Sequence, residues 1–248
     1  MQHGVNAPCV GLLKQLRAVG VTNRRHLDAF WKLVKVRAEV RRGEIIVSSV
    51  QCSKHFAVLL GGMACMTTRH EDGARQIYAF HHAGDFLALQ GFLYPQSMEL
   101  IEVEALSNCS IGTIDRGVLE RAMQGHPELR QALWRAAMVE ASIFRQRMVM
   151  ARWPARQRVA HLLYEQLARL GPRSSVITLS QIDVADAAGL SVVHTNRVLQ
   201  ELRELGALAE KRVIEVLNKE RLQEFAAFDS RYIDPRETLG RWDHHFEN

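Results

Sequence analysis

The chain has 248 residues, of which 47% are hydrophobic and 24% are charged, so it can form one large or two modest globular domains. Its formal net charge of +5 permits an anionic partner without requiring one. The cysteines at positions 9, 52, 65 and 109 lack the spacing of a zinc site or a disulfide framework. No apolar run reaches the ~18 residues of a membrane span, and the first residues lack the apolar core of a signal peptide. We therefore expect a cytoplasmic protein that does not contact a membrane.

The first half of the chain predicts helices followed by a small β-structure. Residues 11–34 carry apolar side chains at helical spacing. Between residues 36 and 118 the pattern changes to short β-prone runs, which are "EIIVSSV", "HFAVLLGG", "ACMTTRH", "RQIYAFHH", "MELIEVEAL" and "CSIGTID". Turn signals such as Glu71-Asp72-Gly73 and Ala83-Gly84-Asp85 separate the runs. Short strands at near-regular intervals predict a β-roll or barrel.

A long helix is predicted over residues 127–152, where no Gly and no interior Pro interrupts the sequence. Leu129, Leu133, Ala136 and Ile143 follow helical steps and form one apolar seam. A helix of this length with such a seam favours coiled-coil-like dimerisation. Packing on its own domain is the alternative, and the charged Glu140 within the seam counts against a dimer interface. A further helix is predicted through "ARQRVAHLLYEQLARL", followed by the loop "GPRSSVIT".

Residues 179–208, "LSQIDVADAAGLSVVHTNRVLQELRELGAL", predict two short helices separated by Gly189. Ser180 is a suitable N-cap for the first helix, with Asp183 as its capping-box partner, and Ser191 caps the second. Gly189 suits a turn with positive φ. The predicted buried stripe of the second helix is Thr195, Val198, Leu199, Leu202 and Leu205. These features predict a helix-turn-helix.

Several residues lie off that stripe, at the start of the second helix, which enters the DNA major groove in such a motif. Arg197 can donate two hydrogen bonds to guanine, Asn196 can pair with adenine, and valines can contact thymine methyl groups. The candidate base-reading residues are Val192, Val193, Asn196 and Arg197. The candidate DNA-backbone residues are Ser180, Gln181, Ser191 and His194, with Lys211 and Arg212 at the tip of a hairpin-like strand, "AEKRVIEVL".

A helical hairpin that only packs is the alternative interpretation of this motif. Residues 153–229 hold ten Lys and Arg against ten Asp and Glu, so charge gives the motif no support.

The order of a small barrel, a long helix and a winged helix-turn-helix resembles the Crp/Fnr superfamily of bacterial transcription regulators. The segments that carry the resemblance are "DGARQIYAFHHAGDFLAL" and the helix-turn-helix of residues 179–208. The resemblance implies an α+β fold. It implies an N-terminal helix and cyclic-nucleotide-binding-like β-roll sensor domain over 1–125 and a dimerisation helix over 126–152. A winged helix-turn-helix over 153–229 and a C-terminal tail over 230–248 complete the expected organisation.

The resemblance also implies a function, namely a homodimer that binds a palindromic operator of double-stranded DNA and contacts RNA polymerase. Members commonly carry Glu where this chain has Val193, so we do not expect the family's consensus operator. The sequence shows no Walker loop and no G-x-S-x-G motif, and we expect neither an enzyme nor a metal site. A ligand-sensing module that acts through protein contacts, with a helix-turn-helix that no longer reads DNA, is the alternative function.

The effector is expected to differ from cyclic AMP. The resemblance places an effector pocket at Gly84, Asp85, Phe86 and Leu87, where cyclic-nucleotide binders carry Gly-Glu. The later segment "YPQSMELIEV" has no arginine to hold a cyclic phosphate. Cys9 stands alone in its region, so no iron–sulfur cluster is expected. Haem ligation by His81 or His82, and a redox-active thiol among Cys52, Cys65 and Cys109, stay open.

Overall fold

The computed structural model describes residues 7–48, 55–94, 102–211 and 213–234. The chain divides into two compact units. The first unit comprises residues 1–68, 79–142 and 233–248, and the second comprises residues 69–78 and 143–232. The division falls within one long helix, between Ser142 and Ile143. No helix among the described residues is long and apolar enough to cross a membrane.

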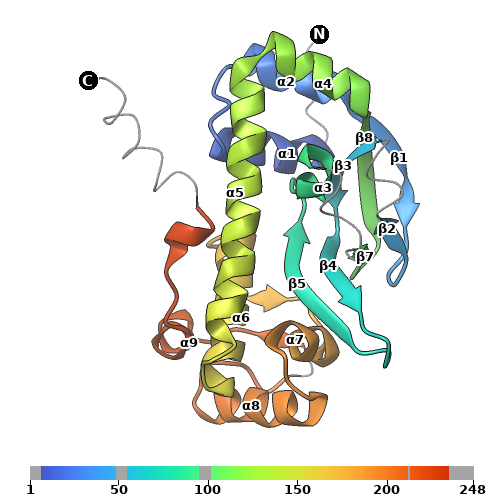
Figure 1. The fold of residues 1–248 in the computed structure, drawn as a ribbon. Coiled ribbons are helices and arrows are strands. Elements are labelled where there is room, and N and C mark those ends of the chain that lie inside the picture. The colour runs from blue at the N-terminus through green and yellow to red at the C-terminus, as the bar shows by residue number, and fades with distance from the viewer. Residues whose placement is uncertain (1–6, 49–54, 95–101, 212, 235–248) are drawn as a thin grey trace. The chain divides into compact units, whose positions relative to one another are not determined.

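Among the described residues, two four-stranded sheets form the β-structure of the first half of the chain, with strand orders β1-β8-β3-β6 and β2-β7-β4-β5 (Figure 1). The strands are β1 (Lys35–Val40), β2 (Ile45–Val47), β3 (His55–Gly61), β4 (Met63–Arg69), β5 (Arg75–His82), β6 (Phe86–Leu87), β7 (Glu102–Ala105) and β8 (Cys109–Asp115). Each of the six predicted β-prone runs contains a strand, as expected. The sequence did not predict β1 or the two-residue β6.

Strand β3, in the sheet β1-β8-β3-β6, is buried on both faces. Its alternate residues Phe56, Val58 and Leu60 pack in a cluster with apolar side chains of the helices. Ala57 and Leu59, which point to the opposite face, pack with side chains of the other sheet, such as Ala64 and Val103. A strand buried on both faces reads as a continuous apolar run, which is what "FAVLL" shows.

The helices of the first unit are α1 (Ala7–Ala18), α2 (Arg24–Leu33), α3 (Leu89–Leu93), α4 (Arg116–Gly125) and the start of α5 (Pro127–Met150). Helix α2 begins at Asn23, whose side chain accepts a hydrogen bond from the Arg25 backbone N–H. Asp115 caps α4 in the same way through the Val118 N–H. Helices α3 and α4 were not expected from the sequence.

The long helix α5 has the predicted position, but its predicted dimer seam is wrong. Leu129, Leu133, Ala136 and Ile143 are all less than 9% exposed in a single chain, so they face its own core rather than a partner. The sequence pattern identified an apolar face correctly, but periodicity does not show which surface covers it. The face that stays exposed carries Trp134, Met138, Met148 and Val149.

The second unit is mainly helical. It contains the end of α5, then α6 (Ala155–Leu170), β9 (Val176–Ile177), α7 (Gln181–Ala188), α8 (Val192–Glu204), β10 (Ile214–Glu215), α9 (Lys219–Ala226) and the 3-10 turn η2 (Ser230–Tyr232). The predicted hairpin strand near residue 214 is short. Its partner is β9, through the pairs Ile214–Ile177 and Glu215–Val176. Strand β9 lies in the segment "GPRSSVIT", for which the sequence predicts a loop.

A buried ion pair joins the end of α5 to α6. The Arg147 guanidinium donates to both carboxylate oxygens of Glu165, over 3.0 and 2.6 Å. The Tyr232 hydroxyl donates to the same carboxylate over 2.5 Å and lies 2.9 Å from His161 Nε2. The Glu165 side chain is fully buried, so the guanidinium and the hydroxyl together compensate its charge.

Candidate nucleic-acid interface

Helix α7 begins with the predicted capping box. The Ser180 hydroxyl accepts a hydrogen bond from the Asp183 backbone N–H over 3.1 Å, and the Asp183 carboxylate accepts one from the Ser180 N–H over 2.9 Å. Val184, Ala185 and Ala188 are buried, which confirms the predicted inner face of this helix. Small alanine side chains allow α8 to pack closely against it.

The turn between the two helices depends on Gly189, which has φ 62° and ψ 47°. This left-handed conformation is available to glycine without steric cost. The Arg158 guanidinium, from α6, donates to the Ala188 carbonyl oxygen over 2.9 Å and satisfies an acceptor at the end of α7. Helix α8 then begins at Ser191, whose hydroxyl accepts a hydrogen bond from the His194 N–H. The turn and the second cap are as predicted.

Helix α8 separates a buried stripe from an exposed face. Thr195, Val198, Leu199 and Leu202 are buried, as predicted, whereas Leu205 is half-buried and caps the helix end. On the opposite side Val193 is 71% exposed, and Val192 and Arg197 are also exposed. This side of the helix therefore presents two adjacent apolar side chains and one guanidinium to solvent.

The two polar residues of this face differ in accessibility. Among the residues that the structure describes, Arg197 makes no hydrogen bond or ion pair, so its guanidinium is not held by the chain itself. Asn196 is half-buried, and its side-chain oxygen is shielded from solvent without a hydrogen-bond partner in the described part of the chain, so this side chain would have to rotate to reach a base. The four base-reading candidates therefore lie together on the first turns of α8, three of them exposed and Asn196 half-buried beside them.

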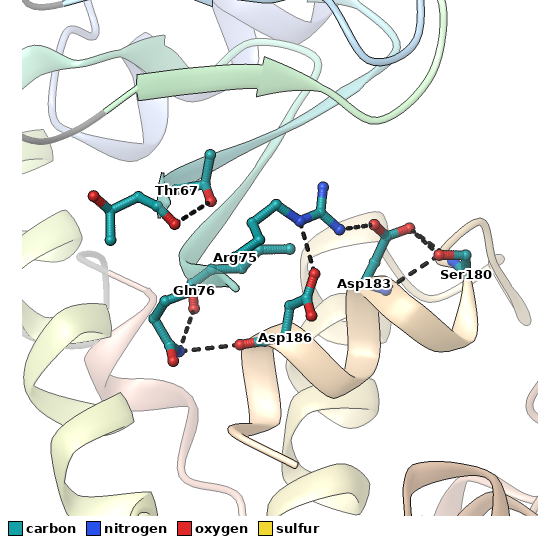
Figure 2. A network of polar contacts seen from close by, with 8 residues as sticks. Thr67, Arg75, Gln76, Ser180, Asp183 and Asp186 are labelled. Carbon is teal, nitrogen blue, oxygen red and sulfur yellow. Dashed lines mark hydrogen bonds and ion pairs between the residues drawn. The ribbon is translucent and has the colours of Figure 1, made fainter. Parts of the chain in front are cut away.

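An arginine fork holds α7 from outside the helix-turn-helix, and sequence reasoning missed it (Figure 2). Arg75, beside the β4–β5 turn, belongs to the same compact unit as α7. Its Nη2 lies 2.6 Å from Asp183 Oδ1 and its Nε lies 2.7 Å from Asp186 Oδ2. Gln76 adds a hydrogen bond to the Asp186 carbonyl oxygen over 3.0 Å. These carboxylates are one helical turn apart and 108 to 111 positions from Arg75, so no local pattern could identify the contact.

The structure corrects one DNA-backbone candidate. The Ser180 hydroxyl donates its only proton to Asp183 Oδ2 over 2.6 Å, and the Ser180 backbone N–H is donated to the same oxygen. Ser180 therefore has no donor left for a phosphate. Among the described residues the Ser191 hydroxyl accepts a hydrogen bond but donates none, so its proton is available to a phosphate.

The remaining DNA-backbone candidates differ in exposure and in whether they already form an ion pair. His194 is exposed, and Gln181 is half-buried at the start of α7. Lys211 is exposed, but its ammonium group lies 2.5 Å from the Glu215 carboxylate. Arg212 lies outside the described residues.

The turn at Gly84–Leu87 is built tightly into the first unit. Gly84 has φ 105°, and a Cβ there would lie 2.4 Å from the Gly11 carbonyl oxygen. The Asp85 carboxylate accepts a hydrogen bond from the His82 N–H over 2.8 Å, while Phe86 and Leu87 are core residues of β6. An effector pocket at this turn stays a prediction. Most of the later segment "YPQSMELIEV", in which cyclic-nucleotide binders carry an arginine, lies outside the described residues.

Two of the three candidates for a redox-active thiol are buried. Cys65 and Cys109 are free thiols inside the β-structure. Burial raises the pKa of the Cys109 thiol, against the opposing effect of hydrogen bonds with Ser107 and Met63, and this disfavours the reactive thiolate. Cys52 lies outside the described residues.

The fold and this site together define a DNA-binding regulator with an N-terminal β-roll domain. Residues 37–126 match the cyclic nucleotide-binding domain, and residues 157–225 match the Crp-like helix-turn-helix domain. The chain belongs to the Crp/Fnr family of transcription regulators, which are not enzymes.

Relatives of known name and structure agree with this assignment. The chain is 28% identical to the nitrogen fixation regulation protein FixK of Azorhizobium caulinodans over 68% of this chain and 69% of that protein. It is 24% identical to the fumarate and nitrate reduction regulatory protein of Escherichia coli K12, over 86% and 88% of the two chains. The structure of FixK2 from Bradyrhizobium japonicum superposes with a TM-score of 0.68 at 25% identity, covering 79% of this chain and 98% of that one.

Proposed function

We propose that this protein is a cytoplasmic homodimer that reads a palindromic DNA operator by placing the start of α8 in the major groove. The observation that carries the proposal is the exposed guanidinium of Arg197 on a helix whose other side is fixed in a core. Arginine can donate two hydrogen bonds to guanine O6 and N7, which distinguishes a G·C pair from the other base pairs.

The neighbouring residues would complete the readout. Val192 and Val193 offer methyl groups that suit thymine, and the half-buried Asn196 can pair with adenine through its amide. Ser191, His194 and Gln181 lie at the starts of α7 and α8, where backbone N–H groups and the helix dipole favour a phosphate. Lys211 would first have to leave Glu215.

A dimer would use the face of α5 that its own chain leaves uncovered. Trp134, Met138 and Met148 follow one another at steps that keep them on one side of the helix, as in a coiled-coil seam. In a two-fold dimer the two α8 helices would contact half-sites ~34–36 Å apart, or a multiple of that spacing.

For the effector of the N-terminal domain we propose only an exclusion. We infer that the effector is not cyclic AMP held in the usual manner, because Asp85 stands where cyclic-nucleotide binders carry Glu and already accepts a hydrogen bond within its own turn. Contact with RNA polymerase is inferred from family membership alone.

The test is selection of bound sequences from a random duplex pool, followed by competition between the selected duplex and a scrambled one. We expect Arg197→Ala to reduce the preference for the selected duplex by about 1–3 kcal/mol while the protein stays folded and dimeric. Arg203→Ala is the matched control, because this arginine lies on the same helix six residues later, near its C-terminal end, and should change the preference little. Unchanged selectivity in Arg197→Ala would refute the groove assignment. No salt-dependent binding to any duplex would favour the alternative of a sensor that acts through protein contacts.

A further inference from the structure

Two histidines and a carboxylate meet in the first unit, far from the helix-turn-helix. His26 lies in the first turn of α2, His126 stands between α4 and α5, and Glu128 is the second residue of α5. One ligand atom from each of these residues lies within 4.8 Å of the other two. His126 and Glu128 are two positions apart at the start of α5, and the fold brings His26, from α2, to them.

The closest contact in this cluster does not have the geometry of a hydrogen bond. His26 Nδ1 lies 2.6 Å from Glu128 Oε1, yet both atoms are shielded from solvent and neither has a hydrogen-bond partner within the described residues. His126 Nδ1 lies 3.6 Å from the same oxygen. A buried imidazole nitrogen and a carboxylate oxygen that lie this close without a hydrogen bond, with a second imidazole nitrogen nearby, form an arrangement that a cation stabilises.

The donor set indicates which cation fits. Two imidazoles and one carboxylate form a His₂Glu set, which binds zinc and leaves a coordination position open. Calcium and magnesium prefer oxygen ligands throughout and would gain little from two histidines. With Zn–N and Zn–O distances of about 2.0–2.2 Å, ligand atoms of one ion lie roughly 3–3.5 Å apart, so small side-chain rotations would bring this cluster to coordination distance.

The backbone around the cluster is well anchored. The Asn23 cap fixes the start of α2, and Leu27 and Phe30 bury the face of that helix next to His26. The His126 carbonyl oxygen accepts the Leu129 N–H over 3.0 Å, and Leu129 is itself buried. Such anchoring holds two of the ligands at fixed positions, which reduces the entropy lost when an ion binds.

The position of Glu128 in the first turn of α5 suits a carboxylate, because the helix dipole favours negative charge there. That preference does not account for two histidines beside it. Both histidines also line a cavity of about 110 Å³ whose other walls are mainly apolar, including Leu16, Val21 and Phe30. The cavity therefore borders two of the three proposed ligands.

We propose that His26, His126 and Glu128 bind one divalent transition-metal ion, with zinc as the best fit, and that the ion joins α2 to the start of α5. This site is independent of the DNA interface. A bound ion stabilises only the folded chain, so it raises the free energy of unfolding in proportion to the logarithm of the metal concentration.

The experiment is titration of metal-stripped full-length protein with Zn²⁺ by calorimetry, and with Co²⁺ by visible absorption. We expect one ion per chain, a cobalt spectrum typical of nitrogen and oxygen ligands, and a higher melting temperature with Zn²⁺. Glu128→Gln keeps the shape of the side chain but removes its charge, and His126→Ala removes one ligand at a half-buried site. Each should weaken Zn²⁺ binding by roughly tenfold or more.

Two controls keep the result specific. His70→Ala removes an exposed histidine of the β4–β5 turn and should leave the affinity unchanged. His244→Ala with His245→Ala removes the paired histidines near the C-terminus, which can bind metals on their own. The proposal is overturned if the protein binds no zinc, if Glu128→Gln and His126→Ala bind it as the parent does, or if only the double variant loses it.

Discussion

At the scale of single residues, the Arg147–Glu165 pair gives the sharpest stability prediction. Glu165→Gln keeps the volume of the side chain but leaves the Arg147 guanidinium, whose side chain is only 10% exposed, without its counter-charge. We expect the free energy of unfolding to fall by about 3–5 kcal/mol, because an unpaired buried charge is not compensated by solvent. Urea denaturation followed by circular dichroism measures the loss.

The matched control is Glu201→Gln, which breaks a pair of the same chemistry on the surface. Arg156 and Glu201 lie 2.5 Å apart, but their side chains are 45% and 43% exposed. Water therefore solvates either charge when the pair is broken, and we expect the free energy of unfolding to change by about 0–1 kcal/mol. A loss in Glu165→Gln as small as in this control would mean that solvent reaches the Arg147 site.

At the scale of elements, α5 shows how far an amphipathic pattern can be interpreted. The sequence predicted its limits to within two residues and found an apolar face, but assigned that face to a partner. In the structure the chain buries it, and a second apolar face stays exposed. Periodicity reports that a face is apolar, whereas only the packing of the other elements decides what covers it.

This second face gives a test of dimerisation. We expect Trp134→Glu together with Met138→Glu to convert the dimer to a folded monomer, because charges at two exposed apolar positions oppose burial against a second copy. Sedimentation velocity measures the mass, and circular dichroism checks that the fold persists. Leu217→Glu, at an exposed apolar position in the second unit, is the control and should stay dimeric. A double variant that remains a dimer would place the interface elsewhere.

The helix-turn-helix was predictable because its signals are local. Ser180, Gly189 and Ser191 each bond to a backbone group within four residues of themselves, and the structure uses each as a cap or turn. Strand β9 has only two residues and pairs with a segment nearly 40 positions later, so neither its length nor its composition marked it. Contacts of this kind depend on the tertiary fold.

At the scale of the whole molecule, the contacts missed from sequence are those that join distant segments. His26 and Glu128 are about 100 positions apart in the chain, and Arg75 is more than 100 positions from Asp183. Each partner alone is an ordinary surface residue type. Only the fold brings the atoms of each pair within 3 Å of each other. The spacing of residues along the sequence therefore could not indicate the cluster of His26, His126 and Glu128.

The two compact units should respond differently to acid, because the buried acid–base cluster described above lies in the second unit. Burial lowers the pKa of His161, against the opposing effects of its hydrogen bond to Ala226 and the charge of Glu165. Burial alone would raise the pKa of Glu165, but Arg147 and Tyr232 hold it below its usual range. In both cases the unfolded chain binds protons that the folded unit does not. Stability is therefore lost as the pH falls below about 6.5 for His161, and further below about 4.3 for Glu165.

Calorimetry at about pH 7.5 and about pH 5.5 should therefore show a lower free energy of unfolding for the second unit at the acid value. In this range His161 binds a proton more readily in the unfolded chain than in the folded unit, whereas Glu165 stays ionised in both. In His161→Gln, whose amide can keep a hydrogen bond to the Ala226 carbonyl oxygen without titrating, this acid loss should shrink. His70→Gln changes an exposed histidine of the same unit and should retain it. The same acid loss in His161→Gln as in the parent would show that another group carries the pH dependence.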